Sequence, residues 1–232
     1  MNYERLDLTM NAQEEVRCRH KFRSVIKETR SQTHFSKHEC EALLLIHYKL
    51  TKTRPLDRKY FRRVMYTLLE LNNEILIENI FSAFDRHNKL VITMESWLVG
   101  LSVLLRGTLE EKISYCFKVY DLMGEGYIKR EYMFRLLKHT FRGNLLGEDP
   151  EELVKDMIDM VMNKMDLDRD GLLSFDDYSQ SVRKNNNLLE VLGYCLPSRP
   201  AVYAFMTTFT PSVSTLHSKL LPSRSRFKIK DF

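Results

Sequence analysis

The chain has 232 residues, 44% of them hydrophobic, and a formal net charge of +5. This length is enough for one large or two small cores. No apolar run approaches the ~20 residues of a membrane-spanning helix, and the first residues contain neither a signal region nor a myristoylation glycine. The cysteines show no paired spacing, which predicts free thiols in an intracellular, cytoplasmic protein; they are Cys18, Cys40, Cys116 and Cys195.

Basic charge is concentrated in three stretches. Residues 16–30, 51–63 and 196–232 each contain six lysines or arginines and one acidic residue. Such stretches favour acidic partners, although a solvated charge run is an equal alternative for each one alone. Protein surfaces, nucleic acid and anionic lipid are all such partners, and no sequence motif selects among them. The expectation of protein partners, with no nucleic acid and no membrane, comes from the family resemblance given below.

The N-terminal region, residues 1–24, is predicted to be a basic helical extension. Beyond it, His34 and His38 stand four residues apart with Cys40 close by, a spacing that could serve zinc. No fourth ligand has an ordered spacing, so we interpret both histidines as surface residues.

A first helix-loop-helix unit is indicated around residues 49–60. Aliphatic residues at helical spacing predict its incoming helix, and Asp57 is placed to cap the outgoing one. This copy of the unit is more cryptic than the other three. The aliphatic residues are Ala42, Leu43, Leu45, Ile46 and Leu50.

A second unit has a twelve-residue loop from Asp85 to Ser96. His87 and Lys89 stand where a cation-binding loop has carboxylates, and Leu90 replaces the glycine of its sharp turn. A lysine inside the loop would repel a cation, so we predict a structural role.

A third unit has its loop at residues 121–132, after a helix that begins with the capping box Thr108–Glu111. Asp121, Glu125 and Gly126 keep three positions of a cation-binding loop. Met123 and Tyr132, however, occupy loop positions 3 and 12, where side-chain ligands are needed. We predict that the loop fold persists without a metal.

The fourth loop, residues 166–177, is intact. Six ligand positions and the turn glycine, Gly171, are in register for an EF-hand loop that binds Ca²⁺. Position 12 is an aspartate, one methylene shorter than the usual glutamate, which weakens Ca²⁺ binding and favours Mg²⁺. The predicted ligands are Asp166, Asp168, Asp170, the Leu172 carbonyl, Ser174 and Asp177.

An aliphatic residue recurs at loop position 8 of all four units, where paired loops form a short strand bridge; these are Leu56, Ile92, Ile128 and Leu173. The sequence thus predicts an all-α fold of two EF-hand pairs, similar to calmodulin or neuronal calcium sensors. The predicted regions are the extension 1–24, an N-terminal pair 25–104, a C-terminal pair 105–195 and an irregular basic tail 196–232.

Two further features leave alternatives. An amphipathic segment of aliphatic residues at 188–192 has two equal readings, as a cover for the groove of the second pair or as a binder of a partner. The eleven methionines suit an adaptable groove, but helical spacing at Met157, Met160 and Met162 favours core packing for most of them.

Several runs resemble the calaxin family: Trp97–Lys112, Tyr115–Asp121, Lys164–Tyr178 and Cys195–Pro197. The resemblance covers roughly residues 24–200. It implies an EF-hand calcium sensor of ciliary or flagellar outer dynein arms, sperm flagella included, placed beside the docking complex on the doublet microtubule. Family members usually have three competent loops and this chain keeps one, which implies a divergent member whose docking role carries over better than its sensing role.

The function predicted from the sequence is therefore modulation or stabilisation of dynein attachment by an axonemal, cytoskeletal EF-hand protein, with dynein-arm or docking-complex components and tubulin as partners. No nucleophile–base constellation, phosphate-binding glycine loop or cofactor motif is present, so we expect no enzyme activity. Two rivals stay open. One is a constitutive structural protein on microtubules, and the other is an EF-hand regulatory subunit of an enzyme.

Overall fold

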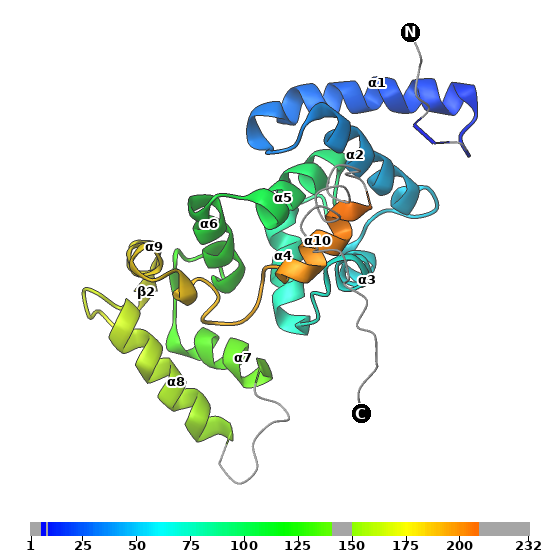
Figure 1. Cartoon of the computed structure of the whole chain (residues 1–232). Helices are drawn as coiled ribbons and strands as arrows, with labels where there is room; N and C mark the ends of the chain where they lie inside the picture. The colour runs from blue at the N-terminus through cyan, green and yellow to red at the C-terminus, as the bar shows by residue number, and fades with distance from the viewer. Residues whose placement is uncertain (1–5, 8, 141–149, 209–232) are drawn as a thin grey trace, which may run out of the picture.

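The computed structural model describes residues 6–7, 9–140 and 150–208. Within them the chain forms ten α-helices, two 3-10 turns and one two-stranded sheet (Figure 1), which confirms the all-α prediction. The helices are α1 Ala12–Thr29, α2 Lys37–Thr51, α3 Arg58–Leu69, α4 Glu74–Phe84, α5 Met94–Arg106, α6 Leu109–Tyr120, α7 Arg130–Thr140, α8 Pro150–Met165, α9 Phe175–Lys184 and α10 Arg199–Thr207; the 3-10 turns are Arg30–Gln32 and Asn186–Leu188, and the strands are β1 Tyr127–Ile128 and β2 Leu173–Ser174.

Local capping sets where several helices begin. Asp57 accepts the Tyr60 N–H at 2.8 Å and starts α3. Thr108 and Glu111 form the predicted capping box of α6, and Ser36 and Glu39 form a second one at α2. Each cap satisfies backbone N–H groups that have no partner inside the helix, so these helix starts follow from local sequence.

The four units pair as predicted. Ile128 stands opposite Leu173 in the antiparallel sheet β1–β2. In the first pair the Ile92 N–H donates to the Leu56 carbonyl at 2.9 Å, beside a bridge between residues 57 and 91. All four aliphatic side chains are buried, so each bridge closes its pair with a nonpolar contact between the two loops.

The two pairs share one hydrophobic core, because α4 contacts both of them. It packs against α3 and α5 of its own pair and against α6 and α7 of the other. Asn79 on α4 also donates through Nδ2 to the Val119 carbonyl of α6 at 2.9 Å. The pairs are therefore joined by packing as well as by the two-residue connection between α5 and α6.

Helix α1 runs across residue 24, the predicted end of the extension, and its apolar face packs on α2 and α5. Cys18, Phe22 and Val25 are buried on that face. None of the helices in the described residues is both long and apolar enough to cross a membrane.

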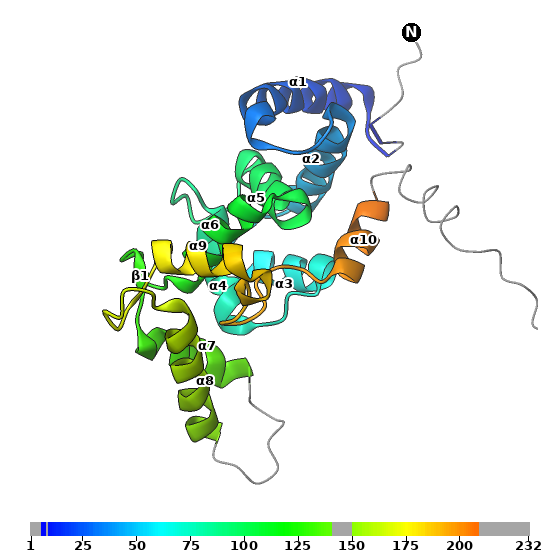
Figure 2. The ribbon, with the colours of Figure 1, turned by 60° about the vertical axis from the view of Figure 1, so that its left-hand side comes forward.

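The prediction of an irregular tail is wrong for residues 199–207, which form α10. Ser198 caps this helix by accepting the Ala201 N–H at 3.3 Å, and Pro200 occupies its first turn. Ala201 and Phe205 are buried, and α10 packs against α3 (Figure 2). Contact with a distant helix stabilises a segment too short to be helical alone. Residues 209–232 of the predicted tail lie outside the described part.

The segment after α9 covers the second pair, the first of the two alternatives. Leu192 and Cys195 are fully buried there. The Tyr178 hydroxyl of α9 donates to the Leu189 carbonyl at 2.5 Å, and the Tyr120 hydroxyl of α6 donates to the Gly193 carbonyl at 2.6 Å. We name residues 189–196 the closing segment.

Among the three methionines singled out on α8, the core prediction holds for Met162 and is wrong for Met160. Met162 is buried and Met157 is half-buried, whereas Met160 is 60% exposed. The three positions cover more than one side of the helix, so packing against α7 and α9 leaves Met160 in solvent. All four cysteines are free, as predicted, and the structure shows that all four are also buried.

Candidate metal site

The loop between α8 and α9 folds around its first carboxylate. Asp166 directly follows α8, and its Oδ2 accepts the Gly171 N–H at 3.1 Å. Gly171 has φ +84°, a conformation that glycine adopts without a Cβ penalty. The glycine therefore allows the turn that brings the loop back toward Asp166.

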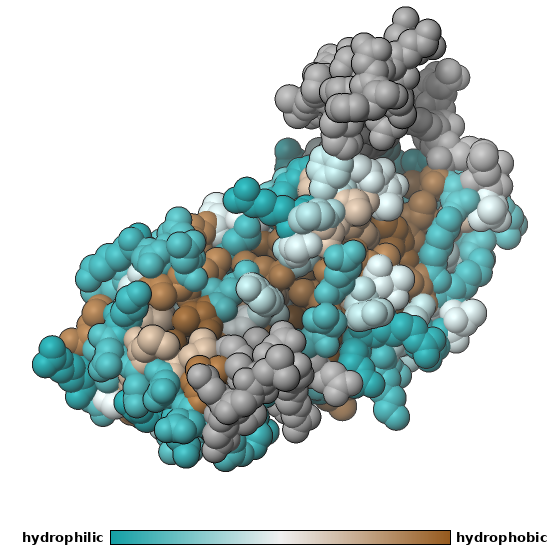
Figure 3. Space-filling model, turned by 60° about the horizontal axis from the view of Figure 1, so that its bottom comes forward, coloured by the Kyte–Doolittle hydropathy of each residue, from teal (hydrophilic) through white to brown (hydrophobic). Residues whose placement is uncertain are grey.

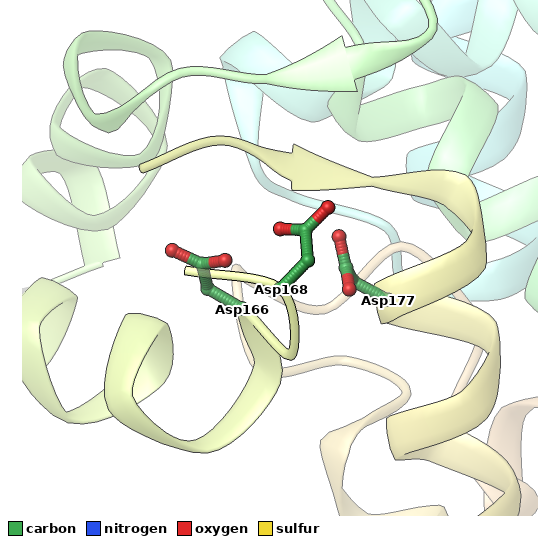
Figure 4. Close-up of side chains that lie close together, drawn as sticks. All are labelled: Asp166, Asp168 and Asp177. Atoms are coloured by element: carbon green, nitrogen blue, oxygen red, sulfur yellow. The ribbon is translucent and has the colours of Figure 1, made fainter. Parts of the chain in front are cut away.

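Three carboxylates converge in this loop. Asp166 follows α8, Asp168 lies in the loop, and Asp177 lies in the first turn of α9 (Figure 4). One oxygen of each lies within 4.8 Å of the others. Elsewhere in the described residues no three His, Cys, Asp or Glu side chains meet this condition. Oxygen ligands at such separations suit a hard divalent cation.

One carboxylate oxygen of this cluster has no hydrogen-bond partner. Asp166 Oδ1 is buried and accepts no hydrogen bond. A buried carboxylate oxygen without a partner is costly, by roughly 1–3 kcal/mol or more for a charged group. A cation between the three carboxylates would supply that partner, so the residues present fit a divalent metal.

The electrostatics agree with that fit. The Asp170 N–H bond to Asp168 lowers the pKa of that carboxyl, but desolvation and the neighbouring carboxylates of Asp170, Asp177 and Asp166 outweigh it, so the pKa lies above its usual value. Crowded negative charge of this kind is relieved by a cation.

Asp177 is held inside the loop by two sets of bonds. Its Oδ2 accepts the Ser174 hydroxyl at 2.5 Å and the Ser174 N–H at 3.2 Å, while Ser174 Oγ accepts the Asp177 N–H at 3.2 Å. Its Oδ1 accepts the Leu167 N–H at 3.2 Å. The shorter side chain is thus oriented by the protein, but a metal would have to share both oxygens.

The other three predicted ligands are not among these three carboxylates. Asp170 is exposed and its Oδ1 accepts the Leu172 N–H at 2.7 Å, outside the three-carboxylate cluster. Ser174 faces Asp177, and Leu172 contributes a backbone carbonyl only. Of the four predicted carboxylate ligands, the structure brings three together.

In the second and third loops, backbone N–H groups of the same loop bind the first carboxylate. In the second unit Asp85 accepts the Lys89 N–H at 2.9 Å and the Leu90 N–H at 2.7 Å, one with each oxygen. In the third, Asp121 accepts the Glu125 N–H at 3.1 Å and the Gly126 N–H at 2.8 Å in the same way. In both loops the first carboxylate is satisfied by backbone N–H groups, whereas Asp166 keeps one buried oxygen without a partner.

The two histidines whose spacing could have served zinc lie at the surface, as predicted. His34 and His38 are exposed, and His34 Nε2 lies 2.6 Å from Glu111 Oε2. Cys40 is buried on α2. These side chains do not form a ligand cluster in the described residues.

Comparison with known proteins agrees with the architecture. The family model of an EF-hand domain pair matches residues 110–183. Calaxin from Xenopus laevis is 41% identical over 179 residues, which cover 74% of this chain and 86% of the relative. Calaxin from Bos taurus is 41% identical over 177 residues, covering 73% and 84%, and that from Danio rerio is 38% identical over 183 residues, covering 76% and 87%. Because identity at this level extends over most of both chains, the chain belongs to the calaxin family of EF-hand proteins.

Proposed function

We propose that the chain is a docking protein of the ciliary or flagellar axoneme that binds components of the outer dynein arm and its docking complex and carries one divalent-cation loop. Similarity to calaxin from several vertebrates supports the axonemal role. The family is non-enzymatic, so the chain acts by binding. Dynein attachment on the doublet microtubule would be stabilised or modulated by that binding.

The surface supports protein partners. Figure 3 shows a face on which hydrophobic residues form a band between hydrophilic margins. Around the loops of the second pair, four large apolar side chains are exposed, each by more than a third: Met123, Met160, Leu167 and Phe175. A hydrophobic band of the kind in Figure 3 is typical of surfaces that other proteins cover.

The observation that carries the metal part of the proposal is the buried, unpartnered oxygen of Asp166 beside two more carboxylates. Asp166, Asp168 and Asp177 would hold the ion. The short Asp177 side chain disfavours the bidentate contact that Ca²⁺ receives from a glutamate, so Mg²⁺ is expected to compete well.

Metal binding would change the relation between α8 and α9. Asp166 directly follows α8 and Asp177 lies in the first turn of α9, so a shared ion would draw the two helices into a fixed angle. Tyr178, the next residue on α9, is fully buried and holds the closing segment. A shift of α9 would therefore reach the cover of the second pair.

Titration calorimetry with Ca²⁺ and with Mg²⁺ tests the metal site. We expect one ion per chain for the wild type and none for Asp166→Asn. The matched control is Asp121→Asn, at the same position of the third loop, where both oxygens already accept N–H groups; it should bind like the wild type. Absence of binding of either ion to the wild type would refute the metal part.

Co-sedimentation with isolated axonemes, in calcium and in chelator, tests the docking part. Binding that changes with calcium, and that Asp166→Asn makes insensitive to calcium, supports a switch. Equal binding in both conditions supports the constitutive structural protein instead. Failure to sediment, together with co-purification with a catalytic chain, would favour the enzyme-subunit rival.

A further inference from the structure

Two of the four cysteines lie side by side in the core of the second pair. Cys116 is in the middle of α6 and Cys195 is in the closing segment, and their Sγ atoms are 3.3 Å apart. Both residues are fully buried. We propose that Cys116 and Cys195 form a modification site, a reversible intramolecular disulfide that fastens the closing segment to α6.

The geometry needs only a small adjustment. A disulfide bond is about 2.05 Å long, so the two sulfur atoms must approach each other by roughly 1.2 Å. Cys116 is fixed by its helix. Cys195, however, belongs to a segment without regular secondary structure, whose backbone can adjust. The approach can therefore come from the closing segment alone.

The closing segment is held in register by tyrosines and by one glutamate. The Tyr178 hydroxyl donates to the Leu189 carbonyl and the Tyr120 hydroxyl to the Gly193 carbonyl. Glu190 accepts the N–H groups of Cys195 and Leu196 at 2.9 and 2.8 Å. These bonds place the Cys195 thiol against Cys116 and within 3.4 Å of the Tyr120 hydroxyl.

The reaction requires an oxidant, and we name a hydroperoxide. One thiol, as thiolate, attacks a peroxide oxygen, breaks the O–O bond and becomes a sulfenic acid as the other oxygen leaves as water or alcohol. The second thiol attacks that sulfur, forms the S–S bond and releases water. Two S–H bonds and one O–O bond are broken, the sulfurs lose two electrons in total, and the peroxide gains them.

The burial of both thiols limits the rate at which the disulfide can form. Desolvation raises the pKa of the Cys116 thiol well above its usual value, and the hydrogen bond and charge of Cys195 act in the same direction. The thiolate is the reactive form, so oxidation has to wait until the closing segment lifts and admits water. Once formed, the bond would hold the segment down and limit further opening.

The remaining cysteines provide internal controls. Cys18 lies on α1 and Cys40 on α2, both buried and both free. Cys40 Sγ lies 3.9 Å from the Phe35 carbonyl rather than against a thiol. Burial alone is thus shared by all four thiols, while proximity to a second sulfur separates Cys116 and Cys195.

The test treats the folded, full-length, metal-free chain with hydrogen peroxide, blocks the remaining thiols and maps the peptides without reduction. We expect a linked pair of peptides containing Cys116 and Cys195, about 2 Da lighter than the two thiol peptides together, with Cys18 and Cys40 alkylated. Dithiothreitol added before the thiols are blocked should leave all four cysteines open to alkylation and remove the link. Cys116→Ser and Cys195→Ser should each abolish the link, and Cys18→Ser and Cys40→Ser should leave it unchanged.

A second variant links the bond to the motion of the closing segment. Tyr178→Phe removes the hydrogen bond to Leu189 and also the Tyr178 bond that lowers the pKa of the Cys116 thiol. Because opening of the closing segment limits the reaction, the linked peptides should still appear several-fold faster, with unchanged helix content by circular dichroism. The proposal is overturned if the wild type keeps both thiols while Cys18 and Cys40 are oxidised, or if Cys116 and Cys195 are oxidised singly. Peptide mapping of the wild type gives this answer even if a serine variant does not fold, and it is independent of metal binding and of axonemal docking.

Discussion

At the scale of single residues, one methylene at loop position 12 bears on which cation the proposed site in the fourth loop would select. Asp177 →Glu should raise Ca²⁺ affinity by about tenfold, equal to ~1.4 kcal/mol, because the longer side chain can give the ion both oxygens. Mg²⁺ affinity should change less. Titration calorimetry measures both. Asp176→Glu, an exposed neighbour outside the cluster, is the control, and equal effects of the two substitutions would contradict the prediction.

Leu90 carries a strained backbone in the second loop. It has φ +59° at the turn position where a competent loop has glycine, and its side chain is 68% exposed. A left-handed conformation costs a non-glycine residue about 1–2 kcal/mol. Leu90→Gly should therefore stabilise the protein by up to ~1 kcal/mol, after the entropy that glycine adds to the unfolded chain is subtracted.

Urea denaturation measures this gain. The mirror experiment is Gly126→Ala, where φ is +85° and the space around a Cβ is open, so that strain acts without a clash. It should destabilise by ~1 kcal/mol. A loss of stability in Leu90→Gly would mean that the leucine side chain makes contacts that outweigh the strain.

At the scale of elements, an ion pair fastens α2 to α5. Arg106 donates to both oxygens of Glu39, at 2.5 and 3.1 Å. Desolvation raises the pKa of Glu39, but the bonds from Arg106 and Ser36 lower it by more, so it lies below its usual 4.5. Because the folded-state pKa is lowered, this stabilisation is present above about pH 4.5 and is lost as the pH falls through the folded-state value.

Glu39→Gln should therefore reduce stability at pH 7, and the difference from the wild type should shrink as the pH falls below about 4.5. Glutamine keeps the capping role at the start of α2, so the charge is the main change. Thermal unfolding of both proteins across pH 3–7 measures the gap between them. A gap of the same size at both ends of the range would count against the ion pair as its cause.

Much at this scale was predictable from the sequence because it depends on neighbours along the chain. The caps at Asp57 and Thr108 and the bridge between Ile128 and Leu173 follow from spacing within each unit. The contact of Cys116 with Cys195 does not, because it joins residues 79 positions apart through the fold of the closing segment. Helix α10 was missed for the same reason, since burial against α3 stabilises it.

The candidate metal site was also predictable in part: its loop was, and the side-chain positions within it were not. Its loop was found from residue types and register, and three carboxylates do converge. The position of Asp170, which accepts the Leu172 N–H away from them, depends on side-chain rotation that register does not fix. The same is true of the Leu167 N–H bond to Asp177 and of the unpartnered Asp166 oxygen.

At the scale of the whole molecule, α10 reaches back from the second pair to the first. Phe205, 4% exposed, is its main buried side chain. Phe205→Ala should cost about 2–4 kcal/mol, at or below the usual range for a buried phenylalanine because α10 is a short edge helix. Hydrogen exchange should rise in α10 and in the facing part of α3, and metal affinity should stay unchanged.

Thr207→Ala, an exposed position on the same helix, is the comparison and should change stability by less than ~0.5 kcal/mol. If Phe205→Ala raised exchange equally in α8 and α9, α10 would be part of a single cooperative unit with the metal loop, contrary to this expectation.

The self-closed loops of Asp85 and Asp121 bear on how the protein is made. In each, both carboxylate oxygens are already bound by backbone N–H groups of the same loop. Two of the turns that an ion would otherwise organise are thus complete as soon as the chain folds. A newly synthesised molecule would not have to wait for a calcium pulse to mature. These two loops would be folded before any ion binds, and an ion that binds later at Asp166 would act on a protein that is already folded.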